Sequence, residues 1–135
     1  MNLNTRFTNN TKRKMAKEKG ENFKMGEIKS TIDWLKGQTE AYCYMVSRGK
    51  PAAVIPIQKR YVLDIKSTVE SFQEIKTFEQ FLADGWISLW IYKKNFMLEI
   101  IKSLPEKPNT VYDHWVIGKV FGYSDEVITE FIEKL

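Results

Sequence analysis

Cysteine, histidine and long apolar runs are all scarce in this sequence. One cysteine and one histidine exclude a disulfide framework within the chain and a His/Cys metal cage built from one copy of it. No apolar run reaches the ~18 residues that span a bilayer. The polar, asparagine-rich start also lacks the apolar segment of a signal peptide. We therefore expect a cytoplasmic protein with no membrane partner, no metal and no cofactor.

The rest of the composition is that of a globular domain. The chain of 135 residues is about one domain long, which excludes a two-lobed enzyme. Hydrophobic residues make up 43% of it and charged residues 28%, and it contains four Trp, six Tyr and eight Phe. Disordered chains lack such aromatic content, so most of this sequence should fold around a core.

The positive charge is concentrated in the first 24 residues. This segment holds seven basic and two acidic residues, a net charge of +5, whereas residues 25–135 hold fourteen basic and fifteen acidic ones. With two aromatics and no sustained apolar period, residues 1–24 are predicted to be a flexible, disordered basic tail. Such a tail suits the phosphates of nucleic acid, and a purely solubilising tail is an equal alternative. The candidate nucleic-acid-binding residues here are Arg6, Lys12, Arg13, Lys14, Lys17 and Lys19.

A helix is predicted over residues 27–36. Ile28, Ile32 and Leu35 recur at spacings of four and three, which is typical of one buried helix face, and Gly37 is a plausible stop. The alternative is a longer helix that continues through Val46, because apolar and small residues keep the same spacing up to that position.

A β-hairpin is the preferred prediction for the next segment. Residues 41–47 and 52–58 are rich in aromatic and β-favouring side chains, and the turn-like residues 48–51 separate them. Pro56 lacks the amide that a central strand would use, which favours an edge position for the second strand. In that strand Ala53 and Ile55 should face the same side.

The second half of the chain is predicted to be helical. Apolar residues recur three apart up to Asp84-Gly85, and residues 86–104 form a helix with very wide apolar coverage. Because this coverage is too large for a solvated exterior, the surface must be core or partly an interface. For the interface, Trp86 and Trp90 are the candidate protein-binding residues. Asn109-Thr110 offers a cap for two last helices over residues 111–121 and 125–134.

The predicted fold class is therefore α+β. A helix and β-hairpin over residues 25–66 precede a helical C-terminal half over residues 67–135. Together they should form a single globular domain that follows the disordered basic N-terminal tail.

A family resemblance is carried by the predicted hairpin. The residues YMVSRGKPAAVIPI from Tyr44 to Ile57, followed by Tyr61 and Leu63, resemble the hairpin of Phd/YefM-type antitoxins. The similarity covers about residues 26–66. It implies a dimeric, nucleic-acid-binding α+β module that represses transcription, with a downstream segment that silences a partner protein. The two cations of the turn, Arg48 and Lys50, join the candidate nucleic-acid-binding residues.

Residues 117–131 follow the spacing of a helix-turn-helix. Gly122 stands at the turn, Ser124 is placed as an N-cap, and Ile128 and Phe131 would fix the second helix. Four carboxylates crowd that second helix, however, and would oppose its entry between two phosphate backbones. We favour a structural helical hairpin, with an acidic protein-binding surface as the alternative. Its candidate residues are Asp125, Glu126 and Glu130.

Catalysis finds little support in the sequence. Asp113 and His114 are adjacent and would point about 100° apart on a helix, so the carboxylate does not orient the imidazole by itself. Cys43 lies in an apolar stretch, where an inert buried thiol is the ordinary finding. We expect no catalytic residues and a protein that is not an enzyme.

The leading hypothesis is a non-catalytic binding protein of the antitoxin or repressor kind. Its basic arm would engage nucleic acid and its aromatic helical surface would engage a protein partner. The alternative is a stoichiometric inhibitor from a bacterial phage or mobile element. Such a protein would act on a host defence or nucleic-acid-processing enzyme.

Overall fold

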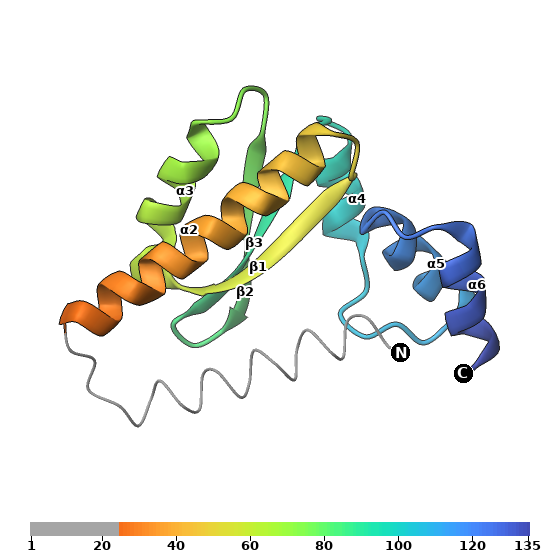
Figure 1. The fold of residues 1–135 in the computed structure, drawn as a ribbon. Helices are drawn as coiled ribbons and strands as arrows, with labels where there is room; N and C mark the ends of the chain where they lie inside the picture. Colours follow the sequence, from red (N-terminus) through yellow and green to blue (C-terminus); the bar gives the residue numbers. More distant parts are fainter. Residues whose placement is uncertain (1–24) are drawn as a thin grey trace. The chain divides into compact units, whose positions relative to one another are not determined.

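The computed structural model describes residues 25–135 of the chain (Figure 1). The α+β class is confirmed, because helices and one three-stranded antiparallel sheet alternate along these residues. The described chain divides into two compact units, with the boundary between Leu98 and Glu99; the single domain suggested by the sequence stays a prediction. No helix of residues 25–135 is long and apolar enough to cross a bilayer.

The first unit begins with α2 (Met25–Ser47), a helix of 23 residues. Its buried stripe consists of Leu35, Thr39, Cys43 and Val46, at spacings of four, four and three. The Thr39 hydroxyl donates to the Leu35 carbonyl at 2.7 Å, which satisfies this buried polar group within the helix. The longer of the two predicted helices is therefore correct, and the strand predicted over residues 41–47 is wrong.

The residues expected to form a hairpin turn are instead the end of α2. The Lys50 amide donates to the Met45 carbonyl at 3.0 Å and the Gly49 amide donates to the Val46 carbonyl at 3.2 Å. These two bonds form a Schellman motif, which requires a left-handed residue after the helix. Gly49 supplies it with φ of +122°, and Pro51 follows where the helix cannot continue.

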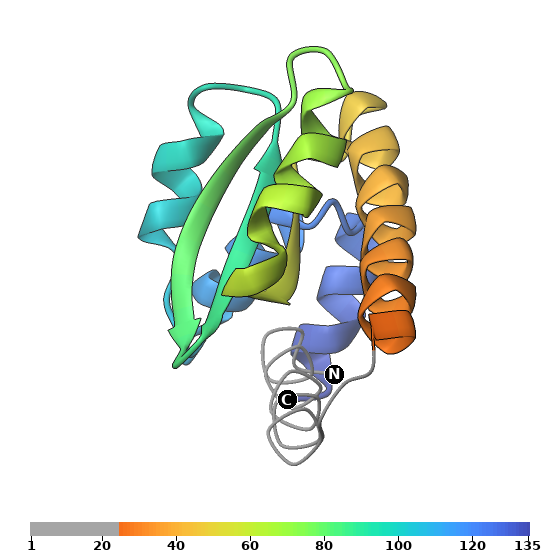
Figure 2. The same ribbon diagram turned by 90° about the vertical axis from the view of Figure 1, so that its left-hand side faces the viewer.

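The sheet has the strand order β1-β3-β2 and both pairings are antiparallel. Its strands are β1 (Ala52–Gln58), β2 (Lys76–Ala83) and β3 (Trp86–Tyr92). A short 3-10 turn, η1 (Lys59–Tyr61), and helix α3 (Val62–Glu70) connect β1 to β2. The edge position of β1 confirms the prediction made from Pro56. Figure 2 shows α2 and α3 on the same side of the sheet.

The core of this unit lies between the sheet and its two helices. Ala53, Ile55 and Ile57 of β1 alternate onto the buried face, as the sequence predicts. Every second residue of β3 joins them, and α2 and α3 close the core from the other side. The β3 and helix members are Ile87, Leu89, Ile91, Leu35, Cys43, Val46, Val62, Ile65 and Val69.

The helices predicted before Asp84-Gly85 and over residues 86–104 are only partly correct. Residues up to Glu70 belong to α3 and residues 97–103 form α4, whereas the segment between them is not helical. Residues 76–92 form the hairpin of β2 and β3, which turns at Asp84-Gly85, where Gly85 has φ of +75°. All seven residues of β3 are buried. A central strand that is buried on both faces is apolar throughout, and periodicity alone does not distinguish it from a buried helix.

The second unit contains most of α4 (Met97–Ser103), and then α5 (Val111–Val120) and α6 (Asp125–Glu133). The last two helices confirm the predictions for residues 111–121 and 125–134. Thr110 caps α5 by accepting the Asp113 amide, and Ser124 caps α6 by accepting the Val127 amide at 3.3 Å. Both caps use the residue types that a helix N-terminus favours.

Candidate nucleic-acid interface

Five cations gather at one end of the sheet in the first unit. In the register of the sheet, Tyr92 at the end of β3 is opposite both Ala52, where β1 begins, and Lys76, where β2 begins. The residues that flank these positions therefore share one end of the sheet, uppermost in Figure 1. We call this set the basic end; it consists of Arg48, Lys50, Lys76, Lys93 and Lys94.

Arg48 is held in place by an aromatic ring of its own helix. Its guanidinium carbon lies 5.1 Å from the centroid of the Tyr44 ring, and Nε and Nη2 donate to the Tyr44 hydroxyl at 3.1 and 2.9 Å. A guanidinium has five N–H donors in a fixed plane. Two of them serve Tyr44, so the remaining donors of this exposed side chain are oriented toward a ligand at low entropic cost.

Lys50 is half-buried at the point where the chain leaves α2 for β1. Burial lowers the pKa of its ammonium group, because removing water penalises the charged form. A phosphate oxygen close to this amine would stabilise the ammonium form that burial disfavours.

The other three cations extend the basic end across the sheet. Lys93 forms a long ion pair with the exposed Glu74 carboxylate at 3.7 Å, and Lys76 bonds the amide oxygen of Asn95. Lys94 makes no ion pair with any residue of the described chain. The acidic residues at this end are Glu70, at the end of α3, and Glu74. Positive charge therefore prevails here although the body of the protein is near neutral.

The side chains of the basic end are of the types that contact a phosphate backbone. A planar guanidinium takes phosphate oxygens in a bidentate manner, and lysines act as point charges around it. Contacts of this kind fix the position of a nucleic acid without identifying its bases. The chemistry offered by the basic end is therefore charge neutralisation, with no group that reads sequence.

The sequence identified two of these five residues. Arg48 and Lys50 are adjacent to a glycine-proline turn signal, and the structure places both at the basic end. Lys76, Lys93 and Lys94 were missed, because only the register of the sheet brings residues so far apart in sequence to one place. No local pattern would have revealed them. The predicted basic residues of the tail lie outside the described residues; they are Arg6, Lys12, Arg13, Lys14, Lys17 and Lys19.

Trp86 and Trp90 are core residues, which is the first of the two interpretations of this apolar stretch, and the structure does not expose them to a protein partner. Their exposed fractions are 4% and 7%, since both belong to the central strand β3. Trp90 donates its indole N–H to the Gln80 side chain of β2 at 3.0 Å. Their side chains are packed within the structure and are not displayed on its surface.

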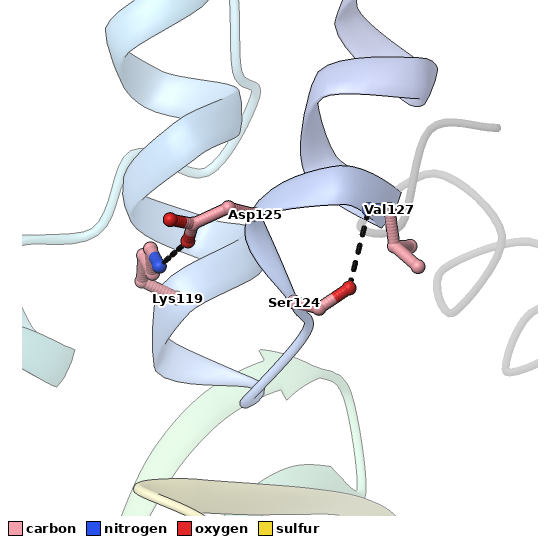
Figure 3. A network of polar contacts seen from close by, with 4 residues as sticks. All are labelled: Lys119, Ser124, Asp125 and Val127. Carbon is pink, nitrogen blue, oxygen red and sulfur yellow. Dashed lines mark hydrogen bonds and ion pairs between the residues drawn. The ribbon is translucent and has the colours of Figure 1, made fainter.

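The three acidic candidates lie on α6 in the second unit, and all are exposed. The Asp125 carboxylate pairs with Lys119 of α5 beside the turn between the helices, next to the Ser124 cap (Figure 3). Glu130 pairs with Lys134 at 2.9 Å, which lowers the pKa of its carboxyl group. Glu126 forms no ion pair with the described residues. The predicted helical hairpin is confirmed, and its binding role stays a prediction.

The groups considered for catalysis are engaged elsewhere. The Asp113 carboxylate accepts the backbone amides of Asn109 at 3.0 Å and Thr110 at 3.3 Å, and these bonds lower its pKa. It completes a capping box and does not orient His114. Cys43 is fully buried in the core of the first unit, and burial raises the pKa of its thiol to about 11. The predicted burial of the thiol is confirmed, and its inertness stays a prediction.

The segment that resembles Phd/YefM-type antitoxins has a helix where the resemblance implies a first strand. Residues 44–47 are the last turn of α2, and β1 matches the second strand of the resemblance. Tyr61 and Leu63 fall at the start of the helical stretch that follows. Comparison of the chain with protein-family models, with curated proteins and with solved structures finds no match.

Proposed function

We propose that this chain is a non-catalytic nucleic-acid-binding protein of the repressor or antitoxin kind. The observation that supports this proposal most directly is the basic end of the sheet. There an oriented Arg48 and four lysines outnumber two acidic residues. The basic residues of the first 24 positions would add to the same electrostatic attraction.

The proposed mode of binding is contact with the phosphate backbone. Each cation that neutralises a phosphate releases a condensed counterion, which favours association at low salt. Arg48 would supply the directional contact and the lysines the surrounding charge. A non-catalytic role agrees with the buried, protonated Cys43 thiol and with the capping role of Asp113. In this proposal, a partner protein that binds the chain would change its affinity for nucleic acid.

The test is the affinity of the full-length chain for a fluorescent 30-base-pair duplex, measured by anisotropy at 100 mM salt. We expect the Lys93→Gln/Lys94→Gln variant to bind about tenfold more weakly or worse, because each lost phosphate contact removes a salt-dependent contribution. The matched control is Lys29→Gln/Lys59→Gln, which removes the same charge from exposed positions at the beginning of α2 and after β1. Equal losses in both variants, or no binding by the natural chain, would contradict the proposal.

A further inference from the structure

We propose that a hollow between α5 and α6 binds a basic segment of a partner protein, which inserts one Tyr or Trp side chain. The hollow has a volume of about 240 Å³ and lies entirely within the second unit. This inference goes beyond nucleic-acid binding and uses none of the residues of the basic end. Its lining residues are His114, Tyr123, Val127, Ile128, Glu130, Phe131 and Lys134.

The walls of the hollow are apolar and partly exposed. Val127 is 48% exposed and Tyr123 39%, while Phe131 packs against the His114 ring with 5.3 Å between centroids. Ile128 is buried against Gly118, whose missing side chain lets the two helices approach. Large apolar side chains that remain exposed around a hollow are typical of a position where a partner inserts an anchor.

His114 adds a polar group at this apolar site. It is only 9% exposed, lines the hollow and makes no side-chain hydrogen bond with the described residues. Neither of its ring nitrogens is among the described side-chain atoms that are buried without a hydrogen-bond partner, so the ring nitrogens remain accessible to a ligand in the hollow. An anchor with an apolar body and a polar tip would fill the hollow and bond this ring. Tyr and Trp are the side chains of that kind.

The charge beside the hollow selects a basic segment. Glu126, Glu130 and Glu133 stand at positions i, i+4 and i+7 of α6, so they form one acidic ridge. The lining residues Val127, Phe131 and Lys134 occupy the neighbouring stripe of the same helix. Glu126 and Glu133 make no ion pair with the described residues. Lysines or arginines that flank the inserted aromatic would pair with this ridge.

The test uses NMR spectra of the isotopically labelled full-length chain titrated with three blocked peptides, Ac-KKAWAKK-NH2, Ac-KKAAAKK-NH2 and Ac-EEAWAEE-NH2. We expect only the first to give saturable shifts of the amides of residues 123–134, and we expect 500 mM salt to weaken it. No saturable shift, or equal shifts with the tryptophan-free peptide, would overturn the proposal. No nucleic acid is present, so the result is independent of the function proposed above.

Two variants test whether the tryptophan peptide binds at the hollow. Val127→Lys adds a charge at its edge and should weaken binding of the tryptophan peptide about tenfold. Val111→Lys makes the same change at a 63% exposed position of α5 that does not line the hollow, and should bind normally. Equal binding by both variants would overturn the proposal. So would shifts of residues 123–134 in Lys12→Gln/Arg13→Gln/Lys14→Gln without peptide, since the chain's own basic residues would then occupy the hollow.

Discussion

Replacing glycine by alanine should have opposite effects at two positions of the same helical segment. Gly37 is an exposed residue in the middle of α2, and Gly49 is the left-handed residue that ends it. A β-carbon added at either position would meet no atom within 4 Å. Contact with the rest of the structure therefore plays no part, and only the local backbone conformation distinguishes the two substitutions.

The magnitudes follow from these conformations. In a helix interior alanine is favoured over glycine by about 0.8–1 kcal/mol, so Gly37→Ala should stabilise the protein by about that amount. At Gly49 the φ of +122° is one that residues with a β-carbon rarely adopt, and a cost of about 1–2 kcal/mol is expected. The two variants should therefore differ in stability by about 2–3 kcal/mol.

The assay is urea unfolding followed by circular dichroism at 222 nm, with the natural chain as reference. We expect a higher midpoint for Gly37→Ala and a lower one for Gly49→Ala, at unchanged slope. If Gly37→Ala lowered the midpoint, residue 37 would not be inside a helix. If Gly49→Ala had no effect, residues 48–51 would not require a left-handed glycine. Either result would refute the description of α2.

Three other predictions concern the caps and cores of the two units. Gly118→Ala should destabilise the helical unit by about 1 kcal/mol net, because overpacking exceeds the helix gain: its β-carbon would lie 2.7 Å from Ile128 Cγ1. Ile128→Ala should remove most of that penalty in a double-mutant cycle of urea unfolding. Because the folded pKa of Asp113 is lowered, its stabilisation is present above the unfolded value of about 3.9 and is lost as pH falls through the folded value. In thermal melts, Asp113→Asn should reduce the loss of melting temperature between pH 5 and pH 3. A loss as large as that of the natural chain would contradict the cap. With a thiol pKa of about 11, Cys43 should react with Ellman's reagent at pH 8 only after denaturant is added, and rapid native reaction would contradict its burial.

Local signals predicted those elements that depend on neighbouring residues. The caps at Thr110 and Ser124 and the glycine turn at Gly122 define α5 and α6, and each acts within one turn of helix. The same kind of signal is ambiguous at Gly49 and Pro51, because a glycine and a proline close together end a helix as readily as they turn a hairpin. The continued spacing of fours and threes through Val46 was the better guide.

Elements that depend on distant partners could not be predicted in this way. The central strand β3 is apolar except at Ser88 because both of its faces are buried, and a window of sequence does not contain the elements that surround it. The same holds for the basic end, because only the pairing of strands places Lys76 and Lys93 at the same end of the sheet as Arg48. The sequence therefore predicts the fold class and the edge position of β1. It does not predict the register of the sheet or the full set of residues at the basic end.

The salt dependence of duplex binding tests the central claim most directly. The logarithm of the association constant should fall linearly with the logarithm of the salt concentration, with a slope of about 0.9 for each phosphate contacted. The account predicts that Lys93→Gln/Lys94→Gln lowers the steepness of this line by about 2 and that Lys29→Gln/Lys59→Gln leaves it unchanged. A slope that both variants share with the natural chain would show that the basic end of the sheet does not contact the phosphates.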